Sequence, residues 1–186
     1  MTAPAGFPPG CVLIEVHVSE LQQLFNSLDP TPFRDRDLDP KAEEFIADWA
    51  REVHRDAPLG LTIHVDGTPP TAQQTEVTQN AVRQYFAARS ATTRQQLRML
   101  FRRGRVSLLI GLVFLAATII GGDLVAGMVN ERFADVVRES FLIGGWVAMW
   151  RPLEVFLYDW WPVRAEARLF DRLSAMTVRV VSSRPA

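Results

Sequence analysis

A charged pair, Arg151 and Glu154, interrupts an otherwise apolar segment, and ionisable groups in such segments are costly and often functional. A spacing of three places both side chains on one face of a helix, and Pro152 removes one hydrogen bond from that helix. The pair could form part of a proton or ion pathway, or fix assembly with a partner helix. It could equally be a structural pair whose side chains reach water at the edge of a membrane. The sequence leaves these alternatives open.

Histidine and carboxylate residues form a second candidate site on alternating segments. Cys11–Val18, Leu61–Asp66 and Met176–Val181 alternate apolar and polar residues, as half-buried strands do. Their polar positions predict one exposed sheet face, which carries Glu15, His17, Thr62, His64, Asp66, Thr177 and Arg179. We interpret this face as a docking surface, with Glu15 and Arg179 as a cross-strand pair.

His17, His64, Glu15 and Asp66 are also residue types that bind metals or transfer protons. No HxxxH, HExxH or CxxC motif supports a metal, however, and any sheet with one wet face shows the same alternation. We therefore predict no metal and no cofactor, and a protein that binds rather than catalyses. A membrane-bound enzyme that uses His17 and His64 is the competing hypothesis.

Other motifs with known chemistry are incomplete or missing. Asp35, Asp37 and Asp39 are spaced like the first ligands of a calcium loop, but Pro40 replaces the required glycine and position twelve is Ile46. These two departures argue against calcium binding. The sequence has no Walker, GxGxxG or GxSxG motif, and no signature of a characterised family.

The longest apolar stretch determines where these candidate sites lie. Val106–Gly122 contains no charged residue, and the stretch continues to Val129 with Asp123 as its only charge. As a helix it is long enough to cross about 30 Å of hydrocarbon. We predict membrane spans at about 106–128 and 139–161, which form a two-helix transmembrane hairpin. The alternative is a soluble helix buried on all sides, for which so small a chain offers few neighbours.

Arginines gather on the N-terminal side of the first span. Seven arginines and no acid lie between Glu76 and Asp123, whereas the loop between the two spans has mixed charge. By the positive-inside rule both termini lie in the cytoplasm, and we expect the inner membrane of a bacterium. Anionic lipid headgroups are expected to contact the residues beside the span, which are Arg98, Arg102, Arg103 and Arg105. The membrane accounts for this charge, so nucleic-acid binding is not predicted.

The length of the chain limits its soluble part to one small domain. At 186 residues, with a net charge of −1, it has room for roughly a hundred residues besides the spans. Cys11 is the only cysteine, so no intramolecular disulfide can form. We predict an α/β (α+β) cytoplasmic domain of about three strands and several helices, split by the hairpin. Residues 1–104 form its first part, 105–161 the hairpin, and 162–186 the helix and strand that complete it.

Together these features predict a small integral membrane protein that acts as a binding, scaffold or assembly subunit. It would be a homo-oligomer or part of a larger membrane complex, with its sheet face or sheet edge as the docking surface. The alternative is a subunit of an oligomeric ion or proton channel or transporter, in which several copies bring Arg151 and Glu154 together. The sequence identifies neither a partner nor a substrate.

Overall fold

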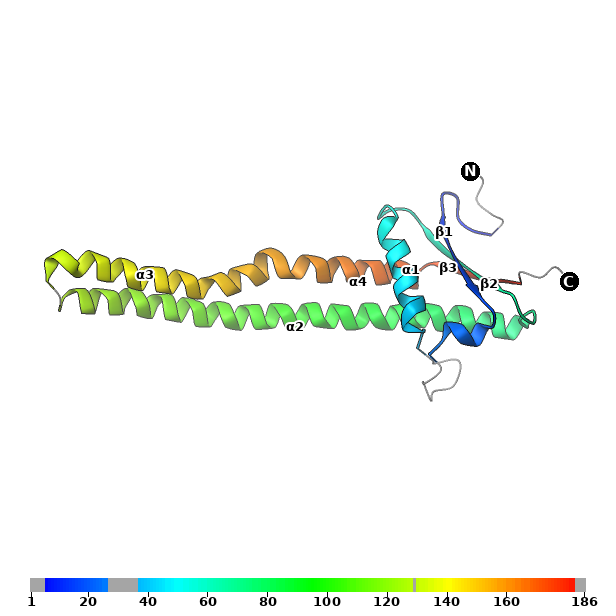
Figure 1. The fold of residues 1–186 in the computed structure, drawn as a ribbon, viewed down its shortest axis with the longest axis horizontal. Helices are drawn as coiled ribbons and strands as arrows, with labels where there is room; N and C mark the ends of the chain where they lie inside the picture. The colour runs from blue at the N-terminus through cyan, green and yellow to red at the C-terminus, as the bar shows by residue number, and fades with distance from the viewer. Residues whose placement is uncertain (1–5, 27–36, 129, 183–186) are drawn as a thin grey trace. The chain divides into compact units, whose positions relative to one another are not determined.

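The fold is given by a computed structural model that describes residues 6–26, 37–128 and 130–182 (Figure 1). The chain forms two compact units. Unit 1 comprises Met1–Thr92 and Ala165–Ala186, and unit 2 comprises Thr93–Arg164. Unit 2 is therefore an insertion in the sequence of unit 1. The domain boundaries predicted from the sequence, at 104/105 and 161/162, mark where the chain is expected to enter and leave the membrane. The compact units are defined by packing instead, so these boundaries stay predictions.

Unit 1 contains a parallel three-stranded sheet in the order β1-β2-β3. The strands are β1 (Val12–Val18), β2 (Leu59–Val65) and β3 (Thr177–Ser182). The mixed α/β class with three strands is confirmed, and the C-terminal strand joins the two N-terminal ones as predicted. Parallel strands need long connections, and here helices follow both β1 and β2 before the next strand begins.

The first long helix begins where local sequence signals place it. In α1 (Pro40–Glu52) Asp39 is the N-cap, and its carboxylate accepts a hydrogen bond from the backbone N–H of Lys41 at 2.9 Å. Pro40 fills the first helical position, where no backbone N–H is needed. The Asp35 and Asp37 part of the incomplete calcium pattern lies largely outside the described residues, which resume at Asp37.

The second long helix, α2 (Ala72–Ala126), follows a capping residue, Thr71. The backbone N–H of Gln74 donates to Thr71 Oγ1 at 3.2 Å, and that of Thr71 donates to Gln74 Oε1 at 2.9 Å, which is a capping box. Between β1 and α1, the described residues form one short 3₁₀ turn, η1 (Leu21–Leu24).

The core of unit 1 lies between the apolar face of the sheet and the helices. Ile14, Leu61 and Ile63 of the strands are fully buried. They cluster with residues of α1, of the first part of α2 and of α4 (Trp160–Ser174), including Ile46, Val82, Phe86, Phe170 and Leu173. The rings of Phe86 and Phe170 stack with centroids 6.2 Å apart. Both stretches of chain that make up unit 1 therefore contribute to one core.

A polar contact also joins α1 to α2 within unit 1. The Tyr85 hydroxyl donates to Glu43 Oε2 at 2.5 Å, and Arg89 Nε donates to Glu43 Oε1 at 2.7 Å. Burial and the hydrogen bond to Glu43 raise the pKa of Tyr85 above its ordinary value. The phenol is therefore a hydrogen-bond donor throughout the neutral range.

In unit 2, the rest of α2 packs against α3 (Glu131–Glu154), and a π-helical turn, η3 (Val155–Asp159), leads from α3 into α4. A Cβ on Gly104 would lie 2.8 Å from Val155, one on Gly111 2.9 Å from Met149 Sδ, and one on Gly122 3.1 Å from Phe141 Cβ. As the residue number on α2 rises, the residue number of its contact on η3 and α3 falls. The two helices are therefore antiparallel (Figure 1).

The predicted two-helix transmembrane hairpin is wrong as stated, because the described residues contain one helix, α2, that is long and apolar enough to cross a membrane. In α3 the uncharged run Ser140–Trp150 lies between Glu139 and Arg151 and has only eleven residues. A membrane span needs about 17 to 25. The predicted second span, 139–161, reaches that length only by including charged residues. The structure thus has one long apolar helix with a less apolar helix packed on it.

Two adjacent glycines of α3 provide a matched test of this packing. Gly145→Val is expected to lower the free energy of unfolding by about 1–3 kcal/mol, since its side chain would overpack the helix contact. A Cβ there would lie 2.6 Å from Leu115 Cδ1 and would also meet the Thr118 hydroxyl. Gly144→Val is the control, because nothing lies within 4 Å of a Cβ at Gly144. Equal melting temperatures for the two variants in one detergent would contradict this packing.

Candidate functional site

The parallel register gathers the predicted docking residues on the sheet face opposite the core. Glu15, Thr62 and Arg179 align in one row, and His17 aligns with His64 in another. Asp66 directly follows β2 and is exposed. Thr62 is only 8% exposed, so it is not available to a partner. Of the predicted face, the exposed residues are Glu15, His17, Asp66 and Arg179, with His64 partly buried.

The predicted cross-strand pair of Glu15 and Arg179 is wrong. β2 lies between β1 and β3, so each of the two residues aligns with Thr62 and not with the other. Arg179 lies over the ring of Phe7, with its Cζ 5.3 Å from the ring centroid. A Cβ on Gly60 would also meet the Phe7 ring, at 2.6 Å. The segment around Phe7 thus covers one end of the polar face.

The other end of this face carries the two histidines. Their rings stack with centroids 4.5 Å apart and an interplanar angle of 9°. Glu15, His17 and His64 each offer one metal-ligating atom, and these atoms lie within 4.8 Å of one another. Asp66, the fourth such residue in the sequence pattern, is not in this group. Because His17 and His64 are far apart in the sequence and meet only through the register, no local motif could reveal their contact.

One ring nitrogen of His64 is unsatisfied. His64 Nε2 is buried and has no hydrogen-bond partner among the described residues. Leaving a buried polar atom without a partner costs of order 1–3 kcal/mol, so native proteins rarely retain one without a reason.

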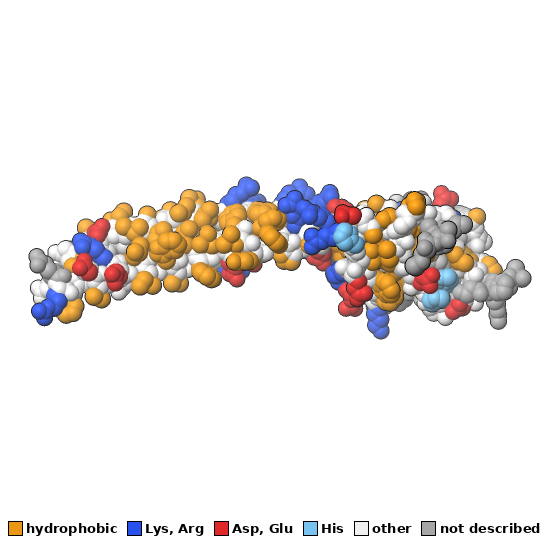
Figure 2. All heavy atoms as spheres, turned by 90° about the horizontal axis from the view of Figure 1, so that it is seen from above, with side chains coloured by type: hydrophobic (Ala, Val, Ile, Leu, Met, Phe, Trp, Pro, Cys, Tyr) orange, Lys and Arg blue, Asp and Glu red, His pale blue; other side chains and the backbone are white. Residues whose placement is uncertain are grey.

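In unit 2, the second half of α2 exposes a continuous apolar surface. Only 11% of its most apolar 18-residue window is buried. Its exposed side chains include Leu109, Ile110, Val113, Ile120 and Leu124, each more than 60% exposed. In Figure 2, which shows the molecule from above, hydrophobic side chains cover most of the visible face of unit 2. Water alone would not stabilise so much apolar surface, so another apolar phase or another molecule is needed to cover it.

Charged residues bound this apolar surface at both ends. Arg105 and Asp123 are eighteen positions apart on α2, which corresponds to about 27 Å of helix. At the far end Arg138 of α3 donates to Asp123 at 2.9 Å. The apolar length therefore matches the thickness of a bilayer core, about 30 Å.

Arginines and aromatic rings lie together at the near end. Arg98, Arg102, Arg103 and Arg105 are all exposed. The Phe101 ring lies 6.2 Å from those of Phe156 and Trp160. Such a combination is typical of a membrane interface.

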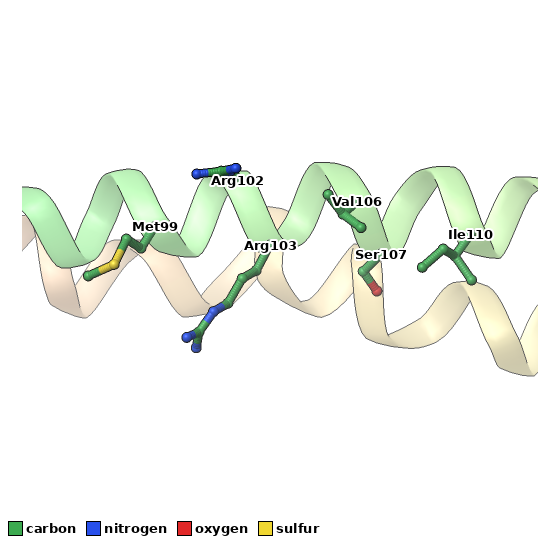
Figure 3. A pocket seen from close by; sticks show the side chains of 6 residues that line it. All are labelled: Met99, Arg102, Arg103, Val106, Ser107 and Ile110. Carbon is green, nitrogen blue, oxygen red and sulfur yellow. The ribbon is translucent and has the colours of Figure 1, made fainter.

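A shallow groove of about 460 Å³ joins these arginines to the apolar surface (Figure 3). It is lined by Met99, Arg102, Arg103, Val106, Ser107 and Ile110. In Figure 3 the side chains of Met99 and Arg103 point to the same side of α2. Guanidinium groups therefore lie toward one end of this groove and aliphatic side chains toward the other.

Arg151 and Glu154 form an ion pair in which Nη1 and Oε2 are 2.8 Å apart. Their side chains are 70% and 40% exposed, and Pro152 between them is buried against Gly111. Gly111 is six positions beyond Arg105, or about 9 Å along α2. The pair is thus shallow within the apolar region, where long side chains can reach the interface. The helix continues through Pro152, and the π turn η3 follows immediately.

No known family model matches the chain, and no curated protein and no solved structure is significantly similar to it.

Proposed function

We propose that this protein is an integral membrane protein in which unit 2 is the anchor and unit 1 is a docking module for another protein chain. The exposed apolar surface of α2 is the observation that carries this proposal. A central helix of a soluble protein would be mostly buried, whereas only 11% of the most apolar 18-residue window of α2 is buried. A signal sequence would lie near the N-terminus, whereas strands β1 and β2 of a folded sheet precede this stretch.

The connectivity places both ends of unit 2 at unit 1. The chain leaves unit 1 at Thr92 and re-enters it at Ala165, and β3 then pairs with β2. In this proposal α2 is the helix embedded in lipid and α3 packs on it, with its Arg151–Glu154 pair near the interface. The arginines favour a cytoplasmic unit 1, and with it both termini, at a bacterial inner membrane.

The sheet supports the docking role. Among the described residues, no strand pairs with the outer edge of β1 or of β3. Exposed edges readily accept a strand from another chain, and neighbouring side chains then provide specificity. The polar face adds exposed charged groups of both signs, Glu15, Asp66 and Arg179. The occupant is either a further copy of this chain or a subunit of a membrane complex.

A conducting assembly stays a prediction, because no described residue specifically favours it over an anchor. In that alternative Glu154→Gln would abolish an ion or proton flux and leave assembly intact. An unchanged flux in the Glu154→Gln variant would reject the conducting-assembly hypothesis.

A photocrosslinking residue in place of Val181 tests the docking proposal. Val181 lies on β3, on the polar face, and is 42% exposed. We expect a specific covalent adduct after irradiation of membranes. The mass of the complex extracted in mild detergent should correspond to a stoichiometric assembly of this chain and its partner. The same residue in place of His54, whose side chain is 82% exposed, is the control and should give none. No adduct at Val181, together with a monomer in detergent, would reject the docking proposal and leave the anchor untouched.

A further inference from the structure

We propose that Glu15, His17 and His64 bind one divalent first-row transition-metal ion, with Zn²⁺ as the reference ion, on the polar face of the sheet. This site is independent of the membrane anchor, since all three residues belong to unit 1. It also departs from the sequence prediction, which favoured no metal.

The fold places these three side chains together without any local motif. His17 and His64 are register partners on adjacent parallel strands, so their side chains leave the sheet side by side. Glu15 is two residues before His17 on β1 and therefore lies on the same face. All three ligating atoms lie within 4.8 Å of one another. The alignment of two strands is sufficient to build the cluster.

The unsatisfied nitrogen is an independent observation that points to a ligand. His64 Nε2 is buried without a hydrogen-bond partner, and a bound cation would satisfy its lone pair. A hydrogen bond from outside the chain would also do so, but two imidazoles and a carboxylate together form a recurrent metal-binding set. Two histidines with one carboxylate are the ligands of several catalytic zinc sites and of non-haem iron sites.

Small side-chain movements complete the geometry. Two atoms that are each about 2.1 Å from one ion can be at most about 4.2 Å apart, so the cluster must contract slightly. The stacked rings must also turn until their nitrogens converge. Glu15 and His17 are exposed and His64 is partly buried, so the movement falls mainly on the two exposed side chains. Three protein ligands leave at least one coordination position for water or for a group from a partner.

Titration of the tag-free, full-length protein in detergent, after treatment with a chelator, tests the site. We expect one Co²⁺ per chain, with visible absorption bands that disappear when Zn²⁺ displaces it. His17→Ala should weaken binding by at least about 100-fold, because loss of even a second-shell partner costs 10- to 100-fold. Glu15→Gln should weaken it in the same direction. Zn²⁺ should raise the melting temperature of the natural protein and not that of His17→Ala.

Two controls distinguish this site from binding elsewhere on the surface. His54→Ala removes the third histidine of the chain, and Glu20→Gln removes an exposed carboxylate that is outside the cluster. Both should leave the affinity unchanged. His64→Ala is expected to lose binding, and circular dichroism of the metal-free variant will show whether it is folded. Stoichiometric uptake that survives in His17→Ala, or no saturable uptake by the natural protein, would overturn the proposal.

Discussion

Arginine in place of both Val113 and Ile120 is expected to remove the protein from the membrane fraction. These two side chains are 63% and 61% exposed, so the substitutions disturb no internal packing. Arginine at the centre of a membrane helix costs about 2.5–3.5 kcal/mol per residue on insertion scales, so the two together cost roughly 5–7 kcal/mol. Carbonate-washed membranes should retain the natural protein and lose the double variant.

The control for this experiment introduces the same charge elsewhere. Phe45 and Trp49 on α1 are 44% and 45% exposed, and arginine at both positions should leave membrane retention unchanged. If the Val113 and Ile120 variant stays in washed membranes as well, α2 is not embedded in lipid. Another molecule would then have to cover its apolar surface. The helical content of both variants, measured by circular dichroism, excludes misfolding as the cause.

The strands were predictable because each alternates apolar and polar residues, although in the central strand β2 every residue except His64 is buried. In β1 Ile14, Val16 and Val18 face the core, and in β2 Leu61, Ile63 and Val65 do so. A half-buried sheet imposes this period of two on the sequence directly. The order of the strands could not be read in the same way. The strand order depends on which helices cross over which strands. Glu15 on β1 and Arg179 on β3 were therefore paired wrongly, because β2 lies between the two strands.

The metal-ligating cluster was not predictable as a cluster. Each member could be identified as exposed and polar, but the contact between His17 and His64 depends on the alignment of two strands whose separation in sequence carries no signal. A shift of one residue in that register would put the two histidines on opposite faces. The unsatisfied His64 Nε2 is a property of packing alone.

The second membrane span shows the limit of reading an apolar composition. Aromatic and aliphatic residues extend from Phe141 to Trp161, and the sequence suggests that they form one apolar segment. Arg151 and Glu154 divide it, and the uncharged run before them is too short to cross a bilayer. The glycine contacts show instead that α3 is supported by α2 along its length. A helix with such support needs less apolar surface of its own than a helix that is alone in lipid.

Removal of the insertion is expected to convert unit 1 into a protein that is soluble without detergent. All residues of the core cluster lie within Met1–Thr92 and Ala165–Ala186. Near the cut, the Ser90 hydroxyl donates to Asp171 Oδ1 at 2.5 Å and lies 3.5 Å from the carbonyl oxygen of Ala167. The two ends are therefore close enough for a linker of about five Gly and Ser residues, within the usual range for neighbouring helices. The shortened protein should unfold cooperatively in water.

A core substitution in this shortened protein measures whether its fold is the one described. Phe86→Ala is expected to lower the free energy of unfolding by about 3–5 kcal/mol, because the ring is fully buried and stacks on Phe170 from the other side of the cut. Phe45→Ala, on an exposed ring, should cost far less. Equal effects of the two substitutions would mean that α2 and α4 do not form a common core without the insertion. A large difference would show that the fold of unit 1 does not depend on unit 2, as an insertion into an independent domain requires.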